Sequence, residues 1–570
     1  MNKIFLKIAA LSFMLIYLAG CNDFLEKDVL GYSTDENFFD TQYKLQAALN
    51  ATYDILQSNQ FMDCEWRFGE ATADDVWGTD EGLSSQMGQL VQFRFNTSNE
   101  WIHSRYEVNY RGIHRANQVI ANAHKVELAI YEYASLKPVR EILGQAKFLR
   151  ALYYFNLVKT YGGVPIRPEI ETVDNLVIPR NSAAEVYAYI EKDLREAAIM
   201  LPTTFTGTDA GKAGEGAAVA LLMKVLMYQA TPGERSDKWE EMVRLGDFFI
   251  DGSPMTFGEM LKFNTYEEDW ETLRERLWFT HKELPDAADQ KESVDTQLPA
   301  LNTTYSLEYR DYYGVALTSY GAEYPYIAQF YNAGEFCRGS IFEVVFNESR
   351  DGSTGDANEG TNVYRELYPS GITAGMPIYT TAGILESLYG NDPRRSSTIT
   401  HMQYSPDGET LQAIPGRYFS LKWYTPVKER PQNDGDDGKN RRLIRFVEVV
   451  LMYAEALNES GYGERAMQQL NKCKTQANTI NNSTTLYTSS GYGYQRDQIW
   501  SERRKELAFE WDRFFDLVRQ KRAAEVLKAY GLERSNRRGF YFREGVNEVF
   551  PIPQVEIDIS HGVITQNPGY

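Results

Sequence analysis

The most constraining feature of this sequence is a long stretch in which apolar residues recur every three or four positions and then stop abruptly. From about Arg140 to Tyr161 the apolar stripe consists of Ile142, Ala146, Leu149, Tyr153 and Leu157. This spacing places all of its members on one face of an α-helix. Gly162, Gly163 and Pro165 follow directly, and residues of these types end helices. The stretch therefore predicts an amphipathic helix with a defined end.

The same spacing recurs in two groups of segments. Ala151 and Phe155, a small residue and an aromatic one turn later, allow helices to approach closely, as in tetratricopeptide-like helix pairs, although no clean repeat of about 34 residues is present. Thr34 or Asp35 is suited to cap the first helix. The fold class we predict is mostly α, with a helical scaffold mainly over residues 34–250 and 440–530. The other predicted helices run over about Thr34–Leu56, Trp101–His124, Ala183–Met200, Gly216–Gln229, Trp239–Phe249, Leu443–Ser460, Glu464–Asn478 and Asp497–Tyr530.

Between these groups, over about residues 253–437, the character of the chain changes. Gly, Pro, Tyr, Ser, Thr and Asn become frequent and the helical stripes fade. The exceptions are a strand-like Ser340–Phe346 and a possible helix around Leu385. Long connections of this kind on a rigid scaffold commonly carry function. We therefore predict long irregular loops with minor strands here, and a ligand-binding region among them.

The charge and the cysteines exclude several classes of protein. The formal net charge is −20, and nucleic acid requires a basic surface, so a nucleic-acid partner is excluded. A strongly anionic polysaccharide is disfavoured for the same reason. The four cysteines, at positions 21, 64, 337 and 473, show no Cys-x-x-Cys spacing. Neither a zinc ribbon nor a redox pair is indicated, and no metal or cofactor is predicted.

The first residues resemble a bacterial lipoprotein signal. Lys3 and Lys7 precede an apolar run, Ile8–Leu18, which is too short to span a bilayer comfortably. Ala19 and Gly20 then lead into Cys21, as in a lipobox. We predict that residues 1–20 are a signal peptide, that residues 21–570 form the mature protein, and that Cys21 is acylated and anchors it to a membrane.

Several blocks, read in order, resemble the SusD family (RagB/SusD) of nutrient-binding outer-membrane lipoproteins of Bacteroidetes. The resemblance implies a single SusD-like domain, a lipid-anchored position on the cell surface, and a SusC-like TonB-dependent transporter as partner. The stretch from about Lys262 to Glu323 is longer than the usual connection of the family. The blocks that carry the resemblance are the lipobox with Phe24-Leu25-Glu26, then Tyr110–Asn117, Ala146–Phe155, Tyr161–Pro165, Leu451–Asn458, Glu502–Glu510, Pro551–Pro553 and Gln566–Tyr570.

No motif indicates an enzyme. The chain contains no Gly-x-Ser-x-Gly elbow and no phosphate-binding loop, and its six histidines never stand four apart. Gly461-Tyr462-Gly463 mimics a dinucleotide fingerprint but follows a helix, so it predicts a turn between helices. A charged cluster near the C-terminus is interpreted as an ion-pair network between residues three or four apart. It consists of Glu502, Arg503, Arg504, Glu506, Asp512, Arg513 and Asp516.

The predicted function is non-catalytic binding of an oligo- or polysaccharide and its delivery to the transporter. Aromatic rings cover the C–H faces of a sugar, and polar side chains satisfy its hydroxyl groups. Trp77 is the strongest candidate, because acidic residues surround it in a polar segment. A peptide ligand, and a glycoside hydrolase built on two carboxylates without a local motif, are the alternatives. The candidate ligand-binding residues are Arg67, Asp74, Asp75, Trp77, Tyr320, Tyr324, Tyr364 and Tyr368.

Overall fold

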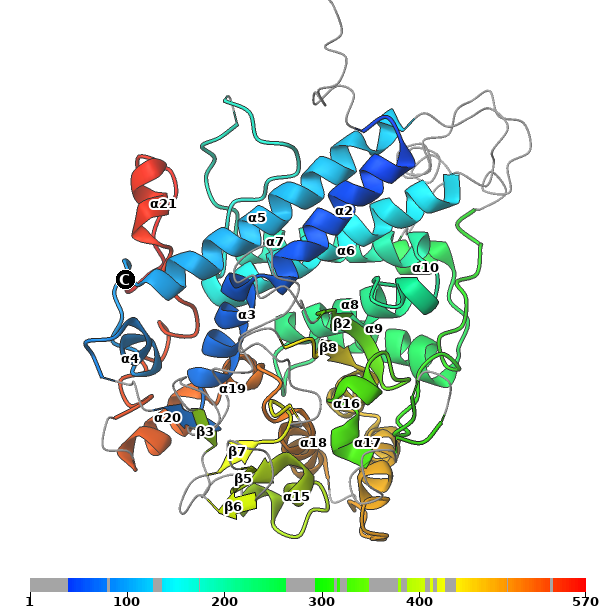
Figure 1. Cartoon of the computed structure of the whole chain (residues 1–570), viewed down its shortest axis with the longest axis vertical. Coiled ribbons are helices and arrows are strands. Elements are labelled where there is room, and N and C mark those ends of the chain that lie inside the picture. Colours follow the sequence, from blue (N-terminus) through cyan, green and yellow to red (C-terminus); the bar gives the residue numbers. More distant parts are fainter. Residues whose placement is uncertain are drawn as a thin grey trace, which may run out of the picture.

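The computed structural model shows a mostly helical protein with a few short strands (Figure 1). One main hydrophobic core runs through the helical part. Cys64, Cys337 and Cys473 are buried free thiols. The structure describes residues 39–78, 82–126, 136–173, 175–262, 293–311, 315–317, 325–347, 378–380, 387–404, 411–413, 418–425, 437–488, 491–533 and 537–570.

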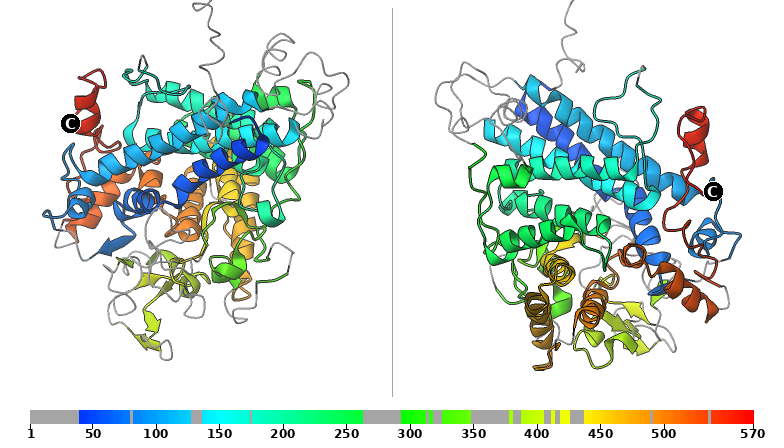
Figure 2. Two further views of the ribbon diagram at one scale, coloured as in Figure 1. Left: turned by 45° about the horizontal axis from the view of Figure 1, so that its top comes forward. Right: turned by 180° about the vertical axis from the view of Figure 1, so that it is seen from behind.

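The first helical group forms a continuous layer in which each helix packs on the next. Helices α2 and α5 pack on α6, α6 on α7, α7 on α8, and α8 on α9. Figure 1 shows these helices crossing the upper part of the molecule side by side, and Figure 2 shows the same order from two other directions. Their bounds are α2 Gln42–Gln57, α5 Glu100–Asn122, α6 Leu136–Tyr161, α7 Ala183–Met200, α8 Glu215–Gln229 and α9 Asp237–Gly246.

Helix ends and small residues explain this packing. Helix α7 begins at a capping box, in which Ser182 and Glu185 each bond the other's backbone N–H. Helices α5 and α6 approach closely at Gly112, where a Cβ atom would lie 2.4 Å from the ring of Tyr153. Helix α8 is apolar on nearly all sides and is buried accordingly. The pairwise stacking of antiparallel helices agrees with the predicted tetratricopeptide-like scaffold.

The second helical group lies below the first. Helix α16 packs on α8 and α9 and also on α17 and α18, so it joins the two groups. The bounds are α16 Phe446–Glu459, α17 Gly463–Asn478, α18 Tyr492–Leu507, α19 Arg513–Arg519 and α20 Ala523–Leu532. Shorter helices are α3 Asn59–Trp66, α4 Gln86–Val91, α10 Phe257–Leu261, α12 Pro325–Ala328, α15 Arg395–Thr398 and α21 Gln554–Ile559.

In the described residues the strands form four antiparallel two-stranded ribbons. β1 pairs with β3 through Val76 opposite Thr380 and Trp77 opposite Tyr379, which are far apart in the sequence. The other pairs are β2 with β8, β4 with β7, and β5 with β6. Their bounds are β1 Val76–Gly78, β2 Ser340–Val344, β3 Ile378–Thr380, β4 Ile399–Thr400, β5 Met402–Tyr404, β6 Leu411–Ala413, β7 Phe419–Ser420 and β8 Arg441–Arg445.

Three predicted helix boundaries are wrong. Helix α2 begins at Gln42, because Thr41 caps it and Phe39–Thr41 is not helical. The first residues of the predicted helix from Leu443 belong to β8, which pairs with β2. The predicted helix Asp497–Tyr530 is three helices, since left-handed residues interrupt it. These residues are Phe509, Trp511 and Lys521, with φ of 68°, 72° and 57°.

Much of the predicted loop-rich region, including Leu385, lies outside the described residues. Within the described part, Ser340–Val344 is a strand as predicted. Gly461 lies in the turn between α16 and α17, also as predicted. In the described residues, no helix combines the length and the apolar character needed to cross a membrane.

Candidate ligand-binding site

Trp77 lies at the centre of a short segment that leaves the helical layer. Helix α3 continues as one π-helical turn over Arg67–Ala71, and the chain then turns through Thr72–Asp75 into β1. Trp77 is half-buried on this strand. Its strand pairs with β3, which in turn contacts β7. The indole is therefore presented where the helical scaffold meets the loop-rich region.

Two buried ion pairs fix the segment just before Trp77. Arg504 Nη2 lies 2.8 Å from Asp74 Oδ2, and Arg513 Nε lies 2.8 Å from Asp74 Oδ1. Arg504 Nε also donates to Asp75 Oδ1 at 3.1 Å. Burial alone would raise the pKa of Asp74, but Arg504 and Arg513 hold it below its usual range. Both carboxylates are thus paired with arginines and enclosed within the protein.

A third acid, Glu70, packs against the same segment, and no local pattern predicted its role. Its Oε2 accepts a hydrogen bond of 3.3 Å from the backbone N–H of Trp511. Burial, and then the nearby Asp75, raises the pKa of Glu70 well above its usual range. At Gly69 a Cβ atom would lie 1.6 Å from the carbonyl oxygen of Trp511. The turn between α18 and α19 therefore packs directly against Gly69 and Glu70, just before the strand that carries Trp77.

Arg67 is placed differently from its predicted neighbours. Its guanidinium lies 3.8 Å from the ring centroid of Trp101 and 4.5 Å from that of Trp66, and it pairs with Asp63. Arg67 is largely buried between α3 and α5. These contacts give Arg67 a packing role beside the segment, while as a ligand contact it stays a prediction.

The four predicted tyrosines, Tyr320, Tyr324, Tyr364 and Tyr368, lie outside the described residues, as does Cys21. Tyr326, which follows Tyr324 closely in the sequence, is fully buried and donates to the carbonyl of Glu506 at 3.2 Å. Among the candidates whose side chains the structure describes, Trp77 is the one with a partly exposed ring.

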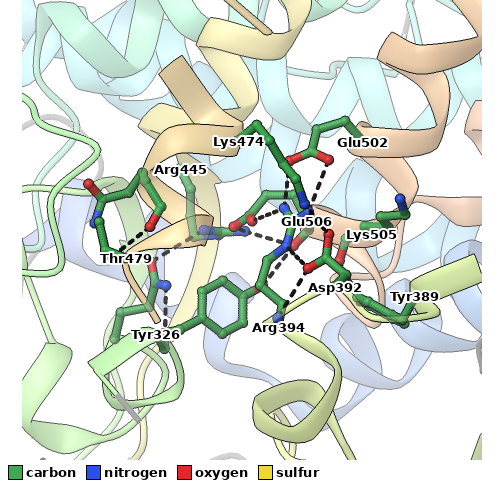
Figure 3. Close-up of polar contacts among 12 residues, drawn as sticks. Tyr326, Tyr389, Asp392, Arg394, Arg445, Lys474, Thr479, Glu502, Lys505 and Glu506 are labelled. Atoms are coloured by element: carbon green, nitrogen blue, oxygen red, sulfur yellow. Dashed lines mark hydrogen bonds and ion pairs between the residues drawn. The ribbon is translucent and has the colours of Figure 1, made fainter. Parts of the chain in front are cut away.

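Helix α18 also connects the Trp77 segment to the loop-rich region. On its other side Arg394 Nη1 lies 2.8 Å from Glu502 and 2.9 Å from Glu506, and Arg394 Nη2 lies 2.9 Å from Asp392 (Figure 3). Lys474 Nζ lies 2.7 Å from Asp392. Burial alone would lower the pKa of Arg394, but the three carboxylates raise it well above its ordinary value. The cluster is fully enclosed and structural.

The C-terminal charges form the predicted ion-pair network, but with different partners from those predicted. Arg503 pairs with Glu448 of α16 and with Asp516 of α19, each at 2.8 Å. Arg504 reaches Asp74 and Asp75. These pairs join different segments of the chain, whereas Asp516 also pairs with Arg519 three residues later on α19, as an i,i+3 pair.

Among the described residues, the structure forms a sizeable cavity that the sequence did not reveal. A cavity of about 680 Å³ lies between the second half of α2 and the segment 207–212. Its lining includes Tyr53, Asp54, Gln57, Lys212 and Phe336. These residues are far apart in the sequence, so no local pattern announced them. No group of three or more potential metal ligands occurs in the described part of the chain.

Two family models match most of the chain between them. Residues 390–570 match the model described as "SusD family". Residues 23–227 match the model described as "Starch-binding associating with outer membrane". The match over 23–227 includes Trp77, α2–α7 and most of α8. The match over 390–570 includes α16–α21, with Arg504 and Arg513, whose side chains pair with the acids before Trp77.

Similar proteins are known along the whole length. SusD-like protein P2 of Formosa agariphila is 26% identical over 98% of both chains. A solved structure named "Laminarin binding SusD-like protein" has a TM-score of 0.66 at 24% identity, covering 93% of this chain and 100% of that one. Surface glycan-binding protein A from Bacteroides thetaiotaomicron, solved in complex with laminarihexaose, has a TM-score of 0.66 at 18% identity, covering 92% and 99%. These likenesses confirm the fold predicted from the sequence.

Proposed function

Because the chain belongs to the SusD family of outer-membrane-associated binding proteins, we propose that it captures a glycan at the cell surface and releases it unaltered. The resemblance read from the sequence is confirmed by the family matches. Members of the family bind their ligands without catalysis, which agrees with the prediction that the protein is not an enzyme. The ligand, the site and the partner are our proposals.

The observation that carries the proposal is the rigid mounting of Trp77. Its indole is partly exposed, while the segment before it is fixed by Asp74 and Asp75 through Arg504 and Arg513. A ring that is already held in place loses little entropy when a sugar stacks on it. A surface site of this kind binds on the order of micromolar to millimolar, which suits release to a transporter.

The ion pairs also favour a glycan over a peptide. A pocket for Lys or Arg side chains of a peptide needs free carboxylates. At the Trp77 segment the carboxylates of Asp74 and Asp75 are enclosed and neutralised by arginines. A laminarin-binding protein and a laminarihexaose complex among the similar structures add support for a neutral β-glucan.

We further propose that residues 1–20 are removed, that acylated Cys21 anchors the protein to the outer membrane, and that a SusC-like TonB-dependent transporter receives the glycan. The lipobox supports the anchor. The family description supports association with the outer membrane, and the kind of partner is what the resemblance read from the sequence implies. A Cys21→Ser variant should leave the membrane fraction, and the wild type should co-purify with a TonB-dependent channel.

The binding proposal is tested by electrophoresis of the purified protein through gels that contain laminarin, soluble starch or inulin. At least one of these neutral glycans should retard the wild type. The same glycan, incubated with the protein, should gain no new reducing ends. Absence of retardation in all three gels would contradict glycan binding, and new reducing ends would show a hydrolase.

A further inference from the structure

Two Gly-Tyr-Gly segments lie side by side at the far end of α18 from Trp77. Gly461-Tyr462-Gly463 forms the turn between α16 and α17, and Gly491-Tyr492-Gly493 begins α18. A Cβ atom at Gly463 would lie 2.7 Å from Oε1 of Gln495, so the two segments are in contact. Asn458 Nδ2 lies 3.5 Å from the carbonyl oxygen of Tyr492.

These segments expose three aromatic rings. Tyr462, Tyr492 and Tyr494 are 45%, 42% and 54% exposed, respectively. We call these three residues the tyrosine surface. Single exposed rings are ordinary. Here Tyr462 and Tyr492 lie on two segments that contact each other, and Tyr494 follows Tyr492 by two residues, so three exposed rings occur close together. Most other tyrosines that the structure describes are buried or half-buried, so this cluster stands out.

The glycines keep the rings uncovered. Nothing lies within 4 Å of a Cβ atom at Gly461, Gly491 or Gly493. Gly461 and Gly491 have φ of 86° and 104°, which side-chain-bearing residues rarely adopt. The residue that precedes each tyrosine is one of these glycines and therefore places no side chain over its ring.

A balanced polar rim surrounds the rings. The guanidinium of Arg496 lies 4.7 Å from the ring centroid of Tyr492, and that of Arg465 lies 5.8 Å from that of Tyr462. The Tyr492 hydroxyl donates to Glu459. Asp247 pairs with Arg465. The rim thus offers both donors and acceptors with little net charge.

We propose that the tyrosine surface is a second saccharide-binding surface, separate from Trp77. Ring faces match the C–H faces of a neutral sugar, and the mixed rim matches its hydroxyl groups. An anionic polymer would meet Glu459 and Asp247, and a nucleic acid would find no basic surface. The ligand class rests on the proposed function, whereas the location rests on the residues described above.

Helix α18 connects the tyrosine surface to the Trp77 segment and determines the distance between them. Tyr492 begins the helix, and Arg504, near its other end, holds Asp74 and Asp75 beside Trp77. Between Tyr492 and Arg504 an α-helix rises roughly 18 Å. A polysaccharide that touches both surfaces gains avidity from the second contact, because that contact is intramolecular.

The test uses the full mature protein in gels of whichever neutral glycan retards the wild type most. The variants are Tyr462→Ala/Tyr494→Ala, Tyr462→Phe/Tyr494→Phe, and Tyr43→Ala as an exposed control on α2, where Tyr43 is 83% exposed. Tyr492 is left intact because it bonds Glu459. The double alanine variant should lose at least fivefold in affinity, while the phenylalanine variant and the control keep the wild-type affinity.

Wild-type retardation of the double alanine variant would overturn the second surface and leave the proposed function standing. Failure of the wild type to bind any of the three glycans would overturn both. Thermal unfolding of each variant separates lost binding from lost folding. If the double alanine variant is unfolded, the phenylalanine variant still tests the proposal, because it keeps the rings and removes only the hydroxyl groups. Wild-type affinity in that variant supports ring stacking, and loss of affinity would exclude it.

Discussion

Arg504 and Asp74 lie 430 positions apart in the sequence, and yet Arg504 Nη2 lies 2.8 Å from Asp74 Oδ2 inside the protein. The pair joins the C-terminal helices to the segment that presents Trp77. Asp74 is fully buried and the Arg504 side chain is largely buried, so removal of either charge leaves its partners less well compensated inside the protein. Positioning of the proposed glycan site thus depends on contacts between the two ends of the chain.

Asp74→Ala should therefore be strongly destabilising. It removes a partner of both Arg504 and Arg513, and breaking a buried pair costs about 3–5 kcal/mol. The free energy of unfolding in urea measures the loss. Lys44→Ala is the matched control, since its pair with Asp40 is one-third exposed and should contribute less than about 1 kcal/mol. Equal, small losses in both variants would contradict a supporting role for Asp74.

Gly69→Ala should destabilise the same segment from beneath. The added Cβ would lie 1.6 Å from the carbonyl oxygen of Trp511, and backbone displacement of this kind costs about 3 kcal/mol or more. Gly493→Ala is the control, because nothing lies within 4 Å there and alanine favours a helix by up to about 1 kcal/mol. The Tm of Gly69→Ala should fall below that of the wild type, whereas the Tm of Gly493→Ala should stay at or above it. Thermal unfolding measures both. A Gly69→Ala variant as stable as the wild type would show that the turn between α18 and α19 does not pack against Gly69.

Glu215 gives the protein a specific pH dependence. Its side chain is buried at the start of α8, and within the described residues neither carboxylate oxygen has a hydrogen-bond partner. Burial raises the pKa of Glu215 to about 9. The unfolded state loses this proton near pH 4–5 and the folded state near pH 9, so stability falls as the pH rises between them, by up to about 1.4 kcal/mol per pH unit.

Glu215→Gln removes this titration. The variant should be more stable than the wild type at pH 8, and the difference should shrink toward pH 5. Urea denaturation at pH 5, 6.5 and 8 measures it. A constant difference at all three pH values would show that Glu215 titrates normally in the folded protein.

The sequence predicted elements that local residues determine. Helix α7 spans Ala183–Met200 as predicted, and the capping residues Ser182 and Glu185 that the structure shows there are also local. The break between α18 and α19 was missed. Phe509 and Trp511 adopt positive φ, and the turn they form is supported by Gly69, which lies far away in the sequence.

The candidate site was predictable in outline only. The acids beside Trp77 were a correct sign that the segment is unusual, but their partners Arg504 and Arg513 were assigned to helical neighbours. Ion pairs between distant segments leave no spacing in the sequence. The tyrosine surface had a visible sign in its repeated Gly-Tyr-Gly, yet only the contact between α16–α17 and α18 shows that the repeats meet.

Titration calorimetry of Trp77→Ala and Trp77→Phe tests the central claim most directly. The titrant is an oligosaccharide of the glycan that best retards the wild type. Loss of the ring should weaken binding at least about tenfold, equivalent to about 1.4 kcal/mol, whereas phenylalanine should keep most of the affinity because it keeps a ring face. Wild-type affinity in Trp77→Ala would contradict the claim that this rigidly held indole captures the sugar.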